Sequence, residues 1–129
     1  VIQAGDPTGT GSSGSDKGPF DDNFHPDLQH NTEGVLSFAK TTDDTNNSQF
    51  FVTETPTRFL DFNHSVFGQL VEGFDVREAI SETQVNNSTQ NQPTNTVQIE
   101  SARTRPSMDA ENPSNVVENR DPPSAFSSK

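Results

Sequence analysis

The fold of this chain is decided by three short apolar runs: GVLSFA at residues 34–39, QFFVT at residues 49–53 and SVFGQLV at residues 65–71. Each run is rich in β-branched or aromatic residues, which favours a buried strand. The first two runs are separated by TTDDTNNS at residues 41–48, a polar sequence typical of a turn-rich loop. Three strands within forty residues predict that the core of the chain is built from β-structure.

Shorter signals extend this β-core in both directions. Residues 5–18 are rich in Gly, Ser and Thr and predict a long loop, and residues 19–31 predict an irregular segment because Pro26 interrupts any helix. Residues 83–96 are polar and of low complexity. The remaining predicted elements are a strand at residues 1–4, one helical turn at 57–61, a helix at 72–82 with its N-cap near Gly73 or Asp75, and a final edge strand at 96–102.

The composition is poor in core-forming residues and strongly acidic. Only 26% of the 129 residues are hydrophobic, and the formal net charge is −11. Large apolar residues are concentrated in residues 32–80, whereas the C-terminal third is polar and has several prolines. We therefore expect a folded domain over residues 1–101 and a disordered linker or tail over residues 102–129.

Charge and residue content also exclude several classes of function. An acidic surface repels phosphate backbones, so neither nucleic acid nor an anionic membrane is expected as a partner. No apolar stretch approaches the ~18 residues that a membrane span needs. The chain has no cysteine, which removes disulfides, thiolate nucleophiles and cysteine-ligated metals. The ten phenylalanines must provide all the aromatic packing, because Tyr and Trp are absent.

Several motifs match known sites only in part. Gly9-x-Gly11-x-x-Gly14 has the letters of a dinucleotide fingerprint but lacks the following apolar helix. An EF-hand loop that began at Asp44 would need Gly and Glu where the chain has Gln49 and Thr55. A turn whose polar side chains hydrogen-bond to its own backbone is therefore favoured over a calcium site.

The histidines and serines give no clearer signal. The three histidines are too scattered to predict zinc, and no Ser lies in a Gly-x-Ser-x-Gly elbow that would favour a hydrolase. Spacing alone favours a structural role for His64. No metal and no cofactor is therefore expected.

Four blocks of sequence, taken in order and spacing, resemble the cyclophilins. They are IQAGDPTGTG at residues 2–11, GVLSFA at 34–39, TNNSQFFVT at 45–53 and FLDFNHSVFG at 59–68. The resemblance covers residues 1 to about 101. It implies an all-β fold with minor helix, namely a closed eight-stranded antiparallel β-barrel capped by two helices. Because the chain opens at the first of these blocks, we expect a barrel truncated at its N-terminus, without its first strands and first helix.

The resemblance also implies peptidyl-prolyl cis-trans isomerase activity and a substrate-binding site. Phe51, Leu60 and His64 would line the pocket for the proline ring, and Gln3 would hydrogen-bond the substrate backbone. Ala39 and the backbone around Lys40 would hold the residue before proline. Gln49 would support the pocket from behind, and Phe59 stands where many members carry Trp.

Three departures from the family pattern carry consequences. The catalytic Arg, which donates to the proline nitrogen, belongs to a block before Val1, so no catalytic residue is expected within the chain. Lys40 replaces the usual Asn and could alter the binding groove. Phe59 cannot donate the hydrogen bond of an indole N–H, so a cyclosporin-like ligand is expected to bind with weakened affinity.

The expected function is that of a monomeric isomerase domain that acts on X-Pro bonds of proline-containing peptides or unfolded clients and assists protein folding. The alternative is a non-catalytic cyclophilin-like module that binds Pro-containing segments within a large multidomain protein. The Asn/Thr-rich spacer and Pro-rich tail resemble linkers of large acidic exported bacterial proteins, which favours an extracytoplasmic location.

Overall fold

The computed structural model describes residues 1–89, 91–105 and 127–128. Contacts divide the chain into two compact units, Val1–Thr94 and Asn95–Lys129. Among the described residues, no helix is long and apolar enough to cross a bilayer.

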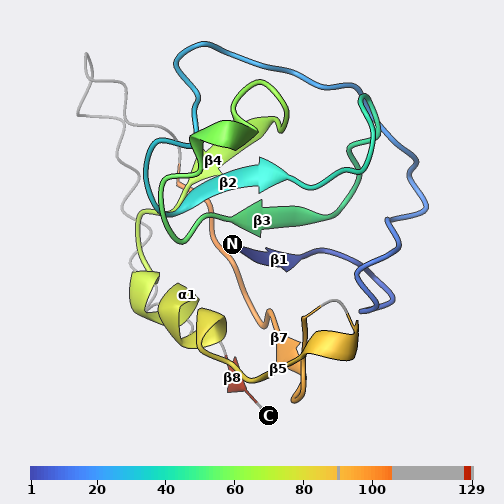
Figure 1. Cartoon of the computed structure of the whole chain (residues 1–129), viewed down its shortest axis with the longest axis vertical. Coiled ribbons are helices and arrows are strands. Elements are labelled where there is room, and N and C mark those ends of the chain that lie inside the picture. The colour runs from blue at the N-terminus through green and yellow to red at the C-terminus, as the bar shows by residue number, and fades with distance from the viewer. Residues whose placement is uncertain (90, 106–126, 129) are drawn as a thin grey trace. The chain divides into compact units, whose positions relative to one another are not determined.

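The first unit is built on a four-stranded antiparallel sheet (Figure 1). Its spatial order is β1-β3-β2-β4, so β3 and β2 form the centre. The strands are β1 (Ile2–Ala4), β2 (Val35–Phe38), β3 (Phe50–Val52) and β4 (Val66–Gln69). All four predicted strands of this unit are confirmed.

The register of the central strands sets which residues form the core. Phe51 of β3 pairs with Gln3 of β1 and with Ser37 of β2. The pairing of β2 with β4 shifts between Leu36 and Ser37, a bulge that bends the strand. Val35, Phe51 and Val52 are the buried hydrophobic residues of the described part, and such a small core agrees with the low apolar content.

The predicted closed eight-stranded barrel is not what the described residues form. β1 and β4 are the two edges of an open sheet. A barrel closes only when its edges pair with one another or with further strands. The described strands provide no such pairing, and the correct description is mostly β with one α-helix.

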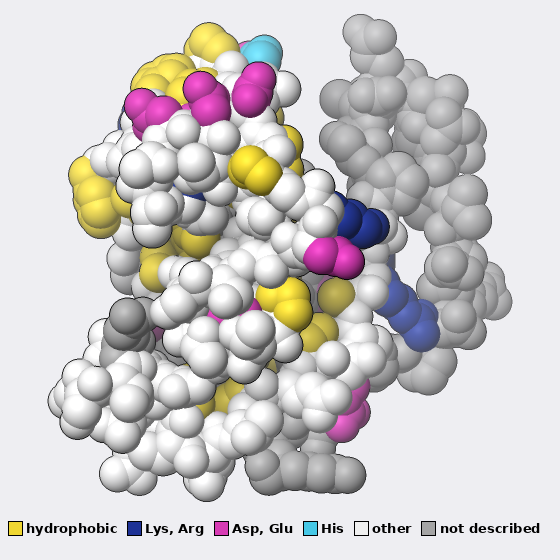
Figure 2. All heavy atoms as spheres, turned by 90° about the vertical axis from the view of Figure 1, so that its right-hand side faces the viewer, with side chains coloured by type: hydrophobic (Ala, Val, Ile, Leu, Met, Phe, Trp, Pro, Cys, Tyr) yellow, Lys and Arg dark blue, Asp and Glu magenta, His cyan; other side chains and the backbone are white. Residues whose placement is uncertain are grey.

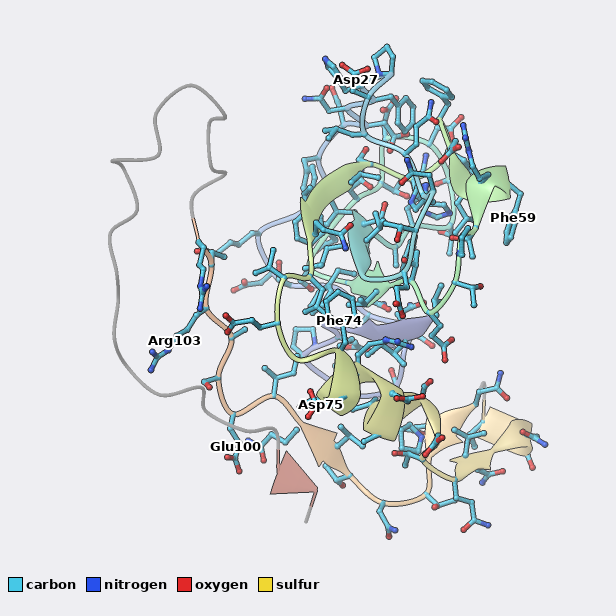
Figure 3. The ribbon with its side chains drawn as sticks, turned by 90° about the vertical axis from the view of Figure 1, so that its left-hand side faces the viewer. Asp27, Phe59, Phe74, Asp75, Glu100 and Arg103 are labelled. Carbon is cyan, nitrogen blue, oxygen red and sulfur yellow. The ribbon has the colours of Figure 1, made fainter. Side chains whose placement is uncertain are left out.

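That helix, α1 (Phe74–Ser81), confirms the prediction for residues 72–82. Its N-cap is Gly73, which has a φ of 82°, and Asp75 lies in the first turn, where its charge favours the helix dipole. Phe74 packs toward the sheet close to Gly34 (Figure 3), since a Cβ on Gly34 would lie 2.9 Å from the Phe74 ring. The predicted helical turn is also confirmed, as the 3-10 helix η1 (Arg58–Leu60).

The polar segment at residues 83–96 is more ordered than its composition indicates. It contains β5 (Val85–Asn86), η2 (Asn87–Thr89) and β6 (Gln92–Pro93), with β5 and β6 antiparallel. The Asn86 side chain accepts the Ser88 backbone N–H at 3.0 Å. Polar side chains therefore stabilise this hairpin where apolar ones are missing.

The second unit contains β7 (Val97–Gln98), which confirms a strand within residues 96–102 and pairs with β8 (Ser127–Ser128). The predicted tail at residues 102–129 includes residues 106–126 and 129, which lie outside the described part of the chain. Disorder of this tail stays a prediction.

Figure 2 shows solvent-exposed hydrophobic side chains on one face, with several Asp and Glu side chains beside them. The exposed large hydrophobic residues include Phe24, Phe62 and Phe59, the last of which is 81% exposed.

Candidate functional site

A cavity of about 370 Å³ lies beside the centre of the sheet. One of its walls is formed by Phe51, which is 4% exposed and lies at the middle of β3. Leu60 and His64 come from η1 and the turn that follows it, and Ala39 follows β2. The residues around the cavity are Val1, Gln3, Gly11, Ala39, Lys40, Thr41, Gln49, Phe51, Leu60 and His64.

The structure thus brings together seven of the eight residues predicted for the site: Gln3, Ala39, Lys40, Gln49, Phe51, Leu60 and His64. Phe59 is not among the lining residues. Figure 3 shows its side chain pointing away from the ribbon of η1. Val1, Gly11 and Thr41 also line the cavity, although the sequence did not assign them to the site. Gly11 and Thr41 lie in two loops, and their place depends on how these loops fold back.

His64 is held in one orientation at the wall of this cavity. Its Nδ1 lies 2.9 Å from the Phe38 carbonyl oxygen, which can only accept. In the neutral ring Nδ1 therefore carries the proton, and Nε2 keeps a lone pair. The ring meets Phe51 edge to face, with centroids 5.4 Å apart. The cavity wall consequently presents one aromatic face and one imidazole.

Two glutamines form the polar side of the cavity. Gln3 Nε2 donates to Gln49 Oε1 at 2.7 Å. Gln49 Nε2 donates in turn to the Ser13 carbonyl at 2.7 Å and to the Gly11 carbonyl at 3.2 Å. Gln49 therefore connects Gln3 to the long loop at residues 5–18.

The Lys40 ammonium does not face the cavity as a free charge. It donates to Asp22 and, at 2.9 Å, to Asp43 Oδ1, and its side chain is 2% exposed. Its Nζ also lies 5.8 Å from the centroid of the Phe24 ring. Burial alone would lower the pKa of Lys40, but the hydrogen bonds that its ammonium donates to the two carboxylates raise the pKa above its ordinary value. Lys40 therefore lines the cavity with its ammonium held by Asp22 and Asp43.

The long loop at residues 5–18 is organised around one carboxylate. Asp6 accepts backbone N–H groups of Thr8, Thr10, Ser12 and Ser13. Burial by itself would raise the pKa of Asp6, but the hydrogen bonds from Thr8, Ser13 and Thr10 hold it well below its usual range. The Gly9-x-Gly11-x-x-Gly14 motif therefore belongs to an Asp-centred loop, without the following helix of a dinucleotide site.

The same chemistry predicts a loss of stability in acid. The pKa values of Asp6, Asp22 and Asp61 are all lowered in the folded state, because hydrogen bonds to the carboxylates outweigh burial. Their stabilisation is present above the unfolded pKa of about 4 and is lost as pH falls through the folded values. We expect the free energy of unfolding in urea to fall between pH 5 and pH 2. It should fall less steeply in Asp6→Asn, and an unchanged slope in this variant would contradict the role of Asp6.

A buried Asp-His-Ser chain of hydrogen bonds lies behind the cavity and was missed at the sequence level. His30 Nδ1 lies 3.0 Å from Asp61 Oδ1, and His30 Nε2 lies 3.1 Å from Ser37 Oγ. Ser37 and His30 are both 0% exposed and line no described cavity. Since no substrate can reach the Ser37 hydroxyl, these residues do not form a hydrolase site. Among the described residues there is also no group of three His, Cys, Asp or Glu placed to hold a metal ion.

A comparison with protein families identifies the fold. The model for cyclophilin-type peptidyl-prolyl cis-trans isomerases matches residues 1–104. The chain belongs to the cyclophilin family. This match begins at the first predicted strand and ends just after β7.

Individual cyclophilins agree with this membership. The chain is 51% identical over 80 residues to a peptidyl-prolyl cis-trans isomerase of Schizosaccharomyces pombe, a match that covers 59% of this chain and 50% of the relative. It is 41% identical over 101 residues to the human peptidyl-prolyl cis-trans isomerase-like 1, covering 77% and 60%. A third relative is the human peptidylprolyl isomerase domain and WD repeat-containing protein 1, 46% identical over 91 residues, covering 69% and 14%. The chain thus spans between about one seventh and three fifths of these relatives.

Solved cyclophilin structures support the same fold. A crystal structure of a Cryptosporidium parvum cyclophilin-type isomerase in the presence of the dipeptide Ala-Pro superposes with a TM-score of 0.67 at 35% identity. The match covers 72% of this chain and 60% of that one.

Proposed function

We propose that the cavity binds the proline of X-Pro segments and that the domain serves peptidyl-prolyl cis-trans isomerisation in protein folding. The observation that carries this proposal is the grouping of apolar Phe51 and Leu60 with polar Gln3 and His64 around one cavity. An apolar concavity with a few oriented polar groups suits a proline ring flanked by peptide bonds. The Cryptosporidium relative crystallised in the presence of Ala-Pro supports the same ligand class.

The reaction requires no covalent step. Rotation about the C–N bond of a peptide faces a barrier of about 18–20 kcal/mol, and X-Pro bonds isomerise unaided in tens to hundreds of seconds. A site accelerates rotation when it binds the twisted amide more tightly than the planar one. In this site the ring of proline would rest on Phe51 and Leu60, and Gln3 would hold the adjacent backbone.

Binding and catalysis depend on different residues in this proposal. In the family pattern, an Arg donates a hydrogen bond to the nitrogen of the twisted proline. No arginine is among the residues that line the cavity in the described part of the chain, and Lys40 is held by Asp22. The lining of the cavity therefore supports proline binding, and a non-catalytic module that binds Pro-containing peptides is the second candidate.

The two candidates are separated by measuring both properties on one sample. Exchange NMR of a proline peptide reports the cis-trans rate, and titration reports its dissociation constant. Binding with faster exchange supports the isomerase, whereas binding without faster exchange supports the module. A chain that binds Ala-Pro and Ala-Ala peptides equally would contradict both candidates.

His64→Ala tests the wall of the site. The substitution removes the imidazole edge against Phe51 and the bond to the Phe38 carbonyl. We expect the dissociation constant of a proline peptide to rise about tenfold, which corresponds to about 1.4 kcal/mol. His25→Ala is the matched control, because the side chain of His25 is 60% exposed and lies outside the cavity lining. Equal peptide affinities in the two variants would show that His64 does not contribute to the binding site.

Cyclosporin affinity tests Phe59. Because Phe59 has no ring donor, a cyclosporin-like ligand is expected to bind more weakly than to members that carry Trp at this position. We expect Phe59→Trp to strengthen binding about fivefold, the equivalent of one hydrogen bond of about 1 kcal/mol. Calorimetry measures this change, and a nanomolar dissociation constant for the unchanged chain would overturn the prediction.

A further inference from the structure

His30 is a fully buried residue that lies outside the lining of the cavity but contacts Phe51 of the lining and Asp61, the neighbour of Leu60. On one side its ring stacks on Phe51, with centroids 5.8 Å apart and planes 20° apart. On the other side its Nδ1 bonds to Asp61, the residue that follows Leu60. One imidazole therefore connects β3 to the turn that carries Leu60 and His64.

For a neutral His30 ring, the protons in this connection have one consistent arrangement. An ionised Asp61 can only accept, so His30 Nδ1 donates to it across 3.0 Å. The neutral ring then has its lone pair on Nε2, which accepts the Ser37 hydroxyl across 3.1 Å. Both nitrogens of the buried ring are satisfied without a net charge on His30.

The Asp61 carboxylate accepts further hydrogen bonds besides the one from His30 Nδ1. Its Oδ1 also accepts the His30 backbone N–H at 2.7 Å. Its Oδ2 accepts Arg58 Nε at 2.8 Å, and the Thr57 backbone N–H donates to the His30 carbonyl at 2.9 Å. Residues 57–61 are thus attached to His30 at both the backbone and the side chain.

Two contacts connect Asp61 and His30 to residues that line the cavity. The His64 backbone N–H donates to the Leu60 carbonyl at 3.1 Å, so a turn fixed at Asp61 also fixes His64. His64 and His30 contact the same ring, that of Phe51. A shift of the Asp61 carboxylate would therefore change the distance between Leu60 and Phe51, the two apolar walls.

We propose that His30 and Asp61 are positioning residues that hold the two walls of the cavity at the spacing a proline ring requires. This inference rests on the proposed function, since it concerns proline binding in the same cavity. Neither side chain contacts the peptide. Their effect is on the placement of Phe51, Leu60 and His64.

The test compares variants that keep or remove the bond between His30 and Asp61. In His30→Asn the side-chain amide takes the place of Nδ1 and still donates to Asp61. In His30→Gln the amide takes the place of Nε2, and the bond to Asp61 is lost. Asp61→Ala removes the bond from the other side. Arg58→Ala removes the other side-chain partner of Asp61. The Arg58 side chain is 60% exposed.

The full chain and each variant are titrated with an Ala-Pro peptide and an Ala-Ala peptide, while NMR follows the ring signals of His64 and Phe51. We expect His30→Gln and Asp61→Ala to weaken Ala-Pro binding about tenfold and to shift both ring signals. His30→Asn should recover affinity to within about threefold, and Arg58→Ala should stay within about twofold.

A control separates positioning from general stability. Thr53→Val removes a fully buried hydroxyl that bonds to Val35 and Thr32 and does not line the cavity. If Thr53→Val weakens peptide binding as much as His30→Gln, loss of stability explains the effect and the proposal is wrong. It is also wrong if His30→Gln binds like the unchanged chain. An unchanged chain that does not prefer Ala-Pro over Ala-Ala would refute the proposed function itself.

Discussion

Phe51→Ala is expected to destabilise the fold by about 3–5 kcal/mol, the usual range for removing a buried aromatic ring, and to abolish binding of proline peptides. Phe51 is 4% exposed, and its ring contacts both His30 and His64. It also forms part of the cavity lining. One substitution therefore removes core packing and the apolar surface for the ligand together. Urea unfolding and peptide titration measure the two effects.

Phe50→Ala is the matched control, because Phe50 is the neighbouring residue on the opposite face of β3. Its ring contacts Phe67, with centroids 6.3 Å apart, and does not line the cavity. We expect it to lose stability yet keep peptide affinity within about twofold in conditions where it is folded. Phe51→Leu keeps most of the buried volume and lets affinity be measured in a stable variant. Normal proline binding by folded Phe51→Leu and Phe51→Ala would show that the cavity is not the binding site.

Asp22→Asn is expected to lower the free energy of unfolding by about 3 kcal/mol, since it leaves the Lys40 ammonium buried without its main counter-charge. The Asp22 side chain is 8% exposed and the Lys40 side chain 2%. Asp22 Oδ1 also accepts Asn46 Nδ2 at 2.8 Å, so the carboxylate joins residues 20–24 to the loop at 41–48. Urea denaturation at pH 7 measures the change.

Asp43→Asn is the control for this pair. Asp43 bonds to the same ammonium at 2.9 Å, but its side chain is 88% exposed. Exposed ion pairs contribute about 0–1 kcal/mol, so little stability should be lost. The double variant Lys40→Met/Asp22→Asn should be more stable than Asp22→Asn alone, because no buried charge is left unpaired. Equal losses in Asp22→Asn and Asp43→Asn would contradict the buried pair.

The strands, and the grouping of seven residues around one cavity, could be predicted because they depend on local patterns and on residues in fixed order. Apolar runs identified β2, β3 and β4, and the resemblance to cyclophilins grouped Gln3, Phe51 and His64 before any geometry was known. The sequence also located α1 from its apolar spacing and Gly73.

What could not be predicted depends on contacts between distant segments. Nothing near His30 in the sequence indicates that it is buried, because its partners Ser37 and Asp61 come from β2 and from the turn after η1. The direction of the Lys40 side chain follows from Asp22, eighteen residues away. The open sheet likewise reflects which strands the chain contains and how they pair.

Proline binding in the cavity is tested most directly by titrating the isotope-labelled chain with an Ala-Pro peptide and, in parallel, with an Ala-Ala peptide of equal length. We expect saturable shifts for Ala-Pro, largest at Gln3, Ala39, Phe51 and His64, and no saturable shifts for Ala-Ala. Equal responses to both peptides, or shifts confined to residues outside the cavity, would contradict it.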